Sequence, residues 1–166
     1  MADRTPEPSP ERRPFPSLAE STGPADSVRP RVLVIEYDAD LRAYVREHLA
    51  TQYEVLEADC GDAGLQKARA ERPDVIVADV RMPGLDGHGL CRALKADPET
   101  DFIPVILMSG KTDLASRIDG FEAEADHYLT KPFHPAELLL RIRNLLVVVA
   151  RLRLKLVVGS FEDGHR

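Results

Sequence analysis

The sequence predicts an α/β fold in which helices cover both faces of a parallel β-sheet. Short runs of branched or small apolar residues recur along the chain, and each run suits a strand buried on both faces. Segments with apolar residues at helical spacing separate these runs, so that five predicted strands alternate with five predicted helices. At 166 residues the chain has room for one such domain together with terminal tails.

The predicted strands are bounded by charged residues, proline or glycine. They cover residues 32–35, 53–57, 75–78, 105–108 and 127–129, and the second has the alternation of an edge strand. Leu41, Tyr44, Val45, His48 and Leu49 repeat at helical spacing after the first strand, and further helices are predicted at residues 63–70, 89–96 and 114–121. Pro135 opens the last helix at a position where proline is tolerated.

Polar residues follow the predicted strands. Right-handed crossovers place the carboxyl ends of parallel strands at one edge of the sheet, where open α/β sheets carry their chemistry. Asp79, Ser109 and Lys131 are therefore expected together, with the segment 36–38 nearby. A carboxylate nucleophile, a hydroxyl donor and an ammonium are the groups needed to take up a phosphoryl group. Asp79 alone could equally be a solvated helix-capping residue, and the chain has no glycine-rich loop for a nucleotide.

Composition excludes several classes of protein. The net charge of −6 argues against a nucleic-acid surface. Cys60 and Cys91 lie far apart, without metal-ligand spacing, which favours a reduced cytoplasmic protein. No apolar stretch is long enough to span a membrane and the N-terminus has no signal core, so no membrane contact is expected. Residues 1–30 are rich in proline and predict a disordered tail, or a ligand for a polyproline-binding partner.

Three segments carry a resemblance to a known family. They read DVRMPGLDG from Asp79, PVILMSG from Pro104 and ADHYLTKPF from Ala125, and they occur in this order. With them the chain resembles, over residues 31–146, the receiver domain of bacterial two-component response regulators. The resemblance implies a doubly wound, flavodoxin-like sheet of strand order 2-1-3-4-5. It also implies that Asp79 accepts phosphate from a histidine kinase or phosphotransfer protein.

The resemblance implies a role for each residue that matches the family pattern. Ser109 would bond the incoming phosphoryl group beside the small residue Gly110, and Lys131 would pair with the phosphate. A cis peptide bond is implied before Pro132. Tyr128 would be a switch whose rotamer follows Ser109, although it is also typical of a half-buried strand aromatic.

The chain departs from the family at its magnesium ligands. Receivers carry two acids after the first strand, and this chain has Glu36 followed by Tyr37, a neutral phenol at pH 7. The resemblance leaves Glu36, Asp79 and the backbone carbonyl of Arg81 as ligands, and it predicts that magnesium binding is weakened or lost. Asp38 is expected to turn into the first helix and not to substitute.

Arg81 and Lys111 occupy the two variable positions that flank the phosphorylation site in the family. They are expected either to attract a phosphate-bearing partner and offset the charge of Asp79, or to be solvated surface cations. An aspartyl-phosphate phosphatase is disfavoured, because such enzymes need a second aspartate two residues after the first, where this chain has Arg81.

The last predicted helix is longer than a receiver domain needs, and it carries apolar residues at heptad spacing. We predict that it dimerises the chain through a helical extension at 147–158, followed by a flexible tail at 159–166. The predicted seam consists of Ile142, Leu145, Val149, Leu152 and Leu156.

Two functions remain open from the sequence. The first is a receiver module, not an output enzyme, that is phosphorylated on Asp79 and signals through a downstream protein partner. The alternative is a pseudo-receiver, in which Tyr37 marks the replacement of phosphorylation by constitutive protein binding.

Overall fold

The computed structural model describes residues 28–110, 118 and 125–162, with side-chain positions given as far as residue 156. It contains a five-stranded sheet in the order β2-β1-β3-β4-β5, and every neighbouring pair is parallel. The predicted strand order is therefore confirmed. The strands are β1 (Arg31–Ile35), β2 (Glu54–Ala58), β3 (Val75–Asp79), β4 (Val105–Ser109) and β5 (His127–Thr130).

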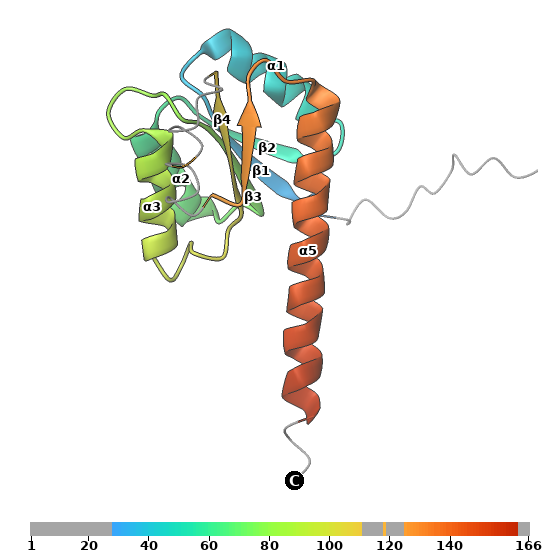
Figure 1. Cartoon of the computed structure of the whole chain (residues 1–166). Helices are drawn as coiled ribbons and strands as arrows, with labels where there is room; N and C mark the ends of the chain where they lie inside the picture. The colour runs from blue at the N-terminus through green and yellow to red at the C-terminus, as the bar shows by residue number, and fades with distance from the viewer. Residues whose placement is uncertain (1–27, 111–117, 119–124, 163–166) are drawn as a thin grey trace, which may run out of the picture.

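Helices cover both faces of this sheet, as Figure 1 shows. The helices α1 (Ala39–Leu49) and α5 (Pro135–Glu162) lie on one face, and α2 (Gly61–Glu71) and α3 (Gly87–Ala96) on the other. The helix predicted at residues 114–121 lies outside the described residues, apart from Ile118, which is helical.

The central strands form the core because they are apolar on both of their faces. Every residue of β3 and β4 is buried, which explains why these strands read as continuous apolar runs and not as alternating ones. Side chains that alternate along β1 enter two different clusters: Leu33 and Ile35 pack with α2 and α3, while Val32 and Val34 pack with α1 and α5. Each fully buried aliphatic side chain contributes about 1.5–3 kcal/mol, so this layer fixes the sheet edge that carries the polar residues.

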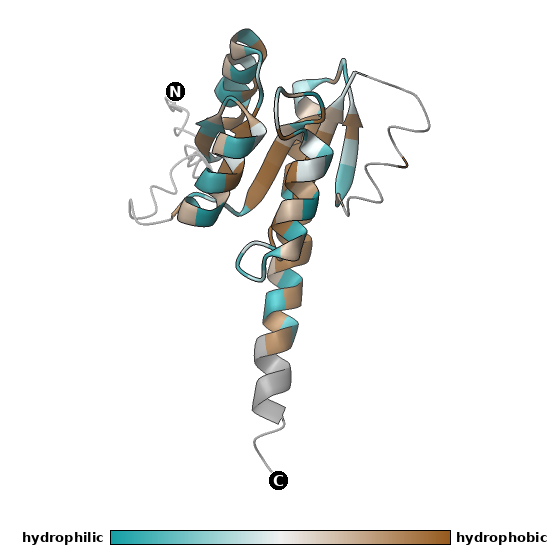
Figure 2. Cartoon of the chain, turned by 90° about the vertical axis from the view of Figure 1, so that its left-hand side faces the viewer, coloured by the Kyte–Doolittle hydropathy of each residue, from teal (hydrophilic) through white to brown (hydrophobic). Residues whose placement is uncertain are grey.

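The helix α5 has two parts with different surroundings. Leu138, Ile142 and Leu145 are 2%, 0% and 8% exposed and pack against the sheet, after which the helix projects beyond the domain (Figure 1). Colouring by hydropathy shows apolar and polar residues mixed along the projecting part (Figure 2). The dimer prediction is therefore wrong for Ile142 and Leu145, because the chain's own core already covers them.

The helix also ends later than the sequence suggested. It continues to Glu162, whereas the predicted tail began at Gly159. A glycine inside a helix costs about 1 kcal/mol relative to alanine, which neighbouring turns offset, so glycine alone does not end a helix. The predicted tails at residues 1–27 and 163–166 lie outside the described residues. Within the described part of the chain, no helix is both long enough and apolar enough to cross a membrane.

Candidate functional site

The carboxyl ends of the strands bring the predicted polar residues together. Asp79 ends β3 and Ser109 ends β4, while Glu36 follows β1 and Lys131 follows β5. Glu36, Asp79 and Ser109 are 2%, 8% and 1% exposed, although all three are polar. We call Glu36, Asp79 and Lys131 the acidic pocket.

Lys131 joins the two carboxylates of the acidic pocket. Its Nζ donates to Oδ2 of Asp79 at 2.8 Å and to Oε2 of Glu36 at 3.2 Å. Lys131 and Asp79 thus form a charge pair, and the cis bond implied before Pro132 is confirmed. The additional pairing with Glu36 was not predicted. One cation therefore compensates two buried anions.

Burial and charge shift the pKa values in the acidic pocket. Burial, followed by the negative charge of Asp79, raises the pKa of Glu36 above its ordinary value, and Lys131 opposes this only in part. Burial alone would lower the pKa of Lys131, but the hydrogen bond and charge of Asp79, followed by Glu36, outweigh it and raise that pKa. The ammonium form of Lys131 is thus stabilised in the folded protein.

Neither of the two residues that follow Glu36 contributes a carboxylate to the acidic pocket. Asp38 caps α1, and its Oδ1 accepts the amides of Asp40 at 2.9 Å and Leu41 at 3.2 Å. Tyr37 is 62% exposed. Oε1 of Glu36 accepts the amide of Asp38 at 3.2 Å, so both oxygens of this carboxylate already have a partner.

A magnesium ion would find an incomplete set of ligands here. The acidic pocket offers the carboxylates of Glu36 and Asp79, together with the carbonyl of Arg81 in the adjoining loop. Within the described residues no group of three or more histidine, cysteine or acidic side chains is arranged to hold a metal. Magnesium often binds through one or two carboxylates plus water and phosphate oxygens, so the residues fit a weak site.

The loop after β3 is shaped by a close approach between α3 and the strand. The amide of Arg81 donates to Oδ1 of Asp79 at 3.2 Å, and the amide of Gly87 donates to the carbonyl of Val80 at 2.9 Å. A Cβ on Gly87 would lie 2.4 Å from the carbonyl oxygen of Asp79, a steric clash that the backbone cannot relieve without moving. Only glycine fits there. Asp86 caps α3 by accepting the amide of Gly89 at 2.7 Å.

The ends of β4 and β5 are tied together beside the acidic pocket. The amide of Lys131 donates to the carbonyl of Ser109 at 2.6 Å, which holds the lysine close to the serine. Gly110 is exposed, and a Cβ on it would meet no atom within 4 Å, so space is open next to Ser109. Arg81 is exposed, and Lys111 lies outside the described residues.

Tyr128 lies on the α2–α3 side of the sheet, where it is half-buried and packs against the core. Its phenol oxygen is buried and has no hydrogen-bond partner in the part of the chain that the structure describes. A buried hydroxyl without a partner destabilises the conformation that holds it, so another rotamer of Tyr128 that finds a partner would be favoured. The aromatic switch remains a prediction.

Two features of the site were not predicted from the sequence. Arg42 on α1 donates from Nη1 to the carbonyl of Glu36 at 2.8 Å and so fixes the turn that carries this carboxylate. A hollow of about 410 Å³ beside Lys131 is lined by Leu41, Tyr44, Pro132 and Phe133. Neither feature has a local signal in the sequence, because each joins segments that are far apart in the chain.

Comparison with protein families gives one match over most of the chain. Residues 32–143 match the response regulator receiver domain. The response regulator PleD of Caulobacter vibrioides is 40% identical over 134 residues, which are 80% of this chain and 28% of that protein. A histidine kinase P4 of Formosa agariphila is 37% identical over 124 residues, 75% of this chain and 9% of that protein. The chain thus spans only part of these longer relatives.

Solved structures agree with this match. The receiver domain of a signal transduction histidine kinase from Syntrophus aciditrophicus superposes with a TM-score of 0.70 at 32% identity, covering 74% of this chain and 93% of that one. The chemotaxis response regulator CheY4 of Vibrio cholerae gives a TM-score of 0.66 at 30% identity, covering 70% of this chain and 98% of that one.

Proposed function

We propose that this chain, which belongs to the response regulator receiver domain family, accepts a phosphoryl group on Asp79 and signals through protein contacts. The observation that carries the proposal is the position of Lys131, whose ammonium lies 2.8 Å from the Asp79 carboxylate at the carboxyl edge of the sheet. A cation in this place can follow a phosphoryl group when Asp79 acquires one.

The proposed transfer needs a donor with a phosphorylated histidine, supplied by a histidine kinase or a phosphotransfer protein. An oxygen of Asp79 forms a bond to phosphorus while the bond from phosphorus to the histidine nitrogen breaks, and the imidazole leaves with that electron pair. Lys131 then exchanges its carboxylate contact for a phosphoryl oxygen, and the hydroxyl of Ser109 donates to another. The open space beside Gly110 gives the group room.

Magnesium, when bound by Glu36, Asp79 and the carbonyl of Arg81, would neutralise charge on the phosphoryl oxygens. The chain's own contribution is the buried ammonium of Lys131, which already lies against both carboxylates. Because only one acid follows the first strand, the transfer should need a higher magnesium concentration than in receivers that keep both acids there.

The hollow beside Lys131 supports contact with the phosphodonor protein. It is lined mainly by apolar side chains, and Tyr44 is 45% exposed there. The hollow adjoins the acidic pocket through Lys131 itself, so a protein that packs its apolar surface into it would bring a donor histidine towards Asp79.

A labelling experiment tests the proposal. The chain is incubated with acetyl phosphate, and phosphorylation is followed by intact-mass spectrometry and by acid-labile phosphate. A mass increase of one phosphoryl group is expected for the wild type and none for Asp79→Asn. Glu137→Gln serves as a folded control that should be labelled normally, because Glu137 is exposed and pairs with Arg141, not with a residue of the acidic pocket. Labelling that persists in Asp79→Asn refutes Asp79 as the acceptor.

The exposed position of Tyr37 keeps a second function open. If the wild type takes up no phosphate with or without magnesium, the chain is a pseudo-receiver that binds its partner constitutively. The ion pairs of Lys131 with Glu36 and Asp79 favour the pseudo-receiver, because they stabilise the arrangement without phosphate.

Restoring the missing acid separates these functions. Tyr37→Asp should tighten magnesium binding about tenfold or more, or roughly 1.4 kcal/mol, because a second carboxylate returns to the end of β1. Isothermal titration with magnesium chloride measures the effect, with Tyr37→Asn as a neutral control. Equal magnesium affinity in the wild type and Tyr37→Asp contradicts the claim that Tyr37 weakens the site.

A further inference from the structure

The side of α5 that faces away from the sheet carries a line of exposed apolar residues. Leu140, Val147 and Leu154 follow one another at intervals of seven residues and are 55%, 42% and 66% exposed. Seven residues make almost two full helical turns, so the three side chains lie on one side of the helix. We call them the outer stripe. It lies opposite the side on which Ile142 and Leu145 enter the core.

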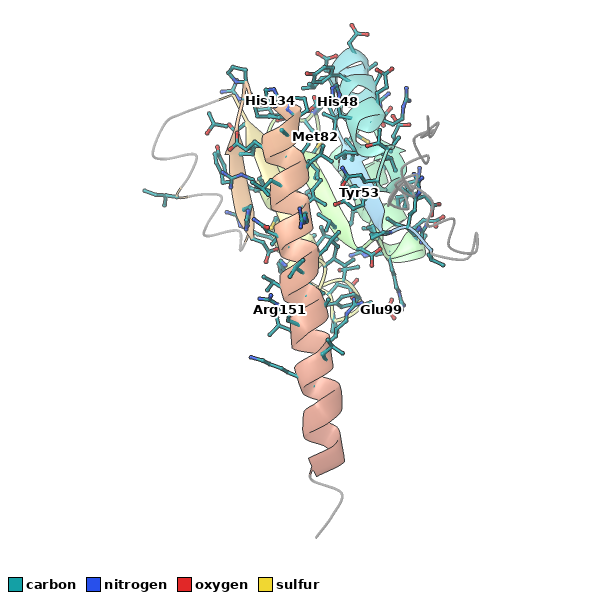
Figure 3. All side chains as sticks on the ribbon, turned by 90° about the vertical axis from the view of Figure 1, so that its right-hand side faces the viewer. His48, Tyr53, Met82, Glu99, His134 and Arg151 are labelled. Atoms are coloured by element: carbon teal, nitrogen blue, oxygen red, sulfur yellow. The ribbon has the colours of Figure 1, made fainter. Side chains whose placement is uncertain are left out.

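Cations flank the outer stripe along its length, and the one acid near it, Glu137 at its start, is paired with Arg141. Arg143 and Arg151 are both exposed, and each lies three or four residues from two members of the stripe, which places them beside it. Figure 3, in which α5 lies in front of the sheet, shows Arg151 beside the helix at about the height of Glu99 in the domain. No ion pair involves either arginine within the described residues. Between Leu138 and Phe161 the helix has no acid and carries three further cations, Arg141, Arg153 and Lys155.

Pairing of the outer stripe with a second copy would bring like charges together. In a parallel pair each arginine meets its own counterpart. In an antiparallel pair centred on Val147, Arg143 of one helix comes beside Arg151 of the other. Helix pairs are normally directed by opposite charges along the seam, and like charges in these positions are destabilising. Neither direction can supply an acid, because this stretch of α5 has none.

A lipid surface also fits poorly. Helices that lie in a membrane interface separate their apolar side from a cationic side. Here Arg143 and Arg151 occupy the same side of α5 as the apolar residues they flank, so the helix cannot bury Val147 and Leu154 in lipid without drawing both arginines down with them.

We propose that the outer stripe binds an acidic amphipathic helix of another protein, which packs apolar residues on the stripe and pairs its carboxylates with Arg143 and Arg151. The proposal extends the function above by giving the signalling contact a surface and a partner chemistry. It does not depend on phosphorylation of Asp79, so its failure and the failure of the phosphoacceptor proposal are separate results.

Binding of a defined peptide to the full chain tests this inference. The probe is a fluorescent helical peptide of four heptads, with leucine at the two core positions and glutamate at the flanking ones. A matched peptide has lysine in place of each glutamate. Fluorescence anisotropy should show micromolar binding of the glutamate peptide, a loss of at least tenfold between 50 and 500 mM salt, and no binding of the lysine peptide.

Two neighbouring residues provide the variants. Val147→Asp should weaken binding of the glutamate peptide at least tenfold, because it places an acid within the stripe. Val148→Asp is the control: Val148 is 51% exposed but lies about a quarter turn around the helix from Val147, so binding should change less than twofold. Circular dichroism confirms that both variants stay folded.

Two other molecules could cover the outer stripe, a second copy of the chain or a lipid surface, and each would give a different result that overturns the proposal. If the wild-type chain sediments as a dimer at tens of micromolar and Val147→Asp sediments as a monomer, a second copy covers the stripe. If the chain binds vesicles of phosphatidylglycerol and phosphatidylcholine but not the glutamate peptide, the stripe contacts lipid. Absence of peptide binding at 100 µM, or equal losses in both aspartate variants, also refutes it.

Discussion

The acidic pocket buries charged groups that are paired within the chain, whereas the outer stripe exposes apolar groups that the chain does not cover. In the pocket two buried carboxylates share Lys131 within 2.8 and 3.2 Å, so the cost of burying charge is offset inside the chain. On α5 the outer stripe leaves apolar side chains 42–66% exposed beside arginines without an ion pair among the described residues. An internally compensated site can exchange one of its partners, whereas an uncompensated surface gains stability only from another molecule.

The two sides of α5 show the same contrast within a single helix. Ile142 is fully buried between the sheet and its neighbours, while Leu154 is 66% exposed beyond the domain. Both are branched apolar residues in one regular helix, so their helix propensities differ little. Their contribution to folding should differ through packing alone.

An aspartate on the buried side of α5 should therefore lower the free energy of unfolding far more than one on the exposed side. Ile142→Asp buries an unpaired carboxylate and removes a core side chain, so it should lower the free energy of unfolding by about 4 kcal/mol or prevent folding. Leu154→Asp should change it by less than about 0.5 kcal/mol. Urea unfolding followed by circular dichroism measures both. Comparable losses in the two variants would mean that the folded domain itself covers Leu154.

The next largest effect should appear in the acidic pocket. Lys131→Ala leaves Glu36 and Asp79 side by side without their cation, and should lower the free energy of unfolding at pH 7 by about 2 kcal/mol. Because the pKa of Lys131 is raised on folding, its stabilising contribution is fully present below its ordinary pKa and is lost only in alkaline solution.

The pH dependence identifies the cause of that loss. Without Lys131 the two carboxylates favour their protonated forms, so the deficit of Lys131→Ala should shrink as the pH falls from 7 towards 4. Urea unfolding at both pH values measures this, and Lys131→Ala combined with Glu36→Gln should recover part of the stability at pH 7. A deficit of the same size at both pH values would point to lost packing instead of charge.

The sequence predicted the parts of this molecule that depend on local pattern. The apolar runs of β1, β3 and β4 and the polar residues that end them agree with the structure. The strand order also agrees, but it was implied by the family resemblance and not by local pattern. The heptad spacing of α5 was misread at Ile142, because the same period describes a helix packed on its own sheet and a helix paired with another chain. Spacing shows which residues share a side of the helix but not which surface covers them.

Contacts between distant segments account for what the sequence did not predict. That Lys131 would hold Glu36 as well as Asp79, and that Arg42 would hold the carbonyl of Glu36, depends on how closely the ends of β1, β3 and β5 approach. The need for glycine at position 87 arises from the distance between α3 and the carbonyl of Asp79, and no neighbouring residue in the sequence reports it.

The first residue of β5 contacts α5, and its substitution should give the smallest of the expected effects. Nδ1 of His127 lies 3.5 Å from Nη1 of Arg141 on α5, while Lys131 follows the other end of the strand. Burial, followed by the charge of Arg141, lowers the pKa of His127 below its ordinary value, and Asp126 opposes this only in part.

The direction of this shift sets the sign of the expected pH effect. As the pH falls through the ordinary histidine range near 6.5, the unfolded chain takes up a proton that the folded chain binds less well, so stability is lost. His127→Gln should remove that part of the pH dependence, a difference below about 0.5 kcal/mol between pH 7.5 and 5.5 because the histidine is partly exposed. Thermal unfolding of the two proteins across this range measures it, and Arg141→Gln should reduce the same effect without abolishing it. A His127→Gln variant whose stability follows the wild-type curve at every pH would show that Arg141 and burial leave the histidine unperturbed.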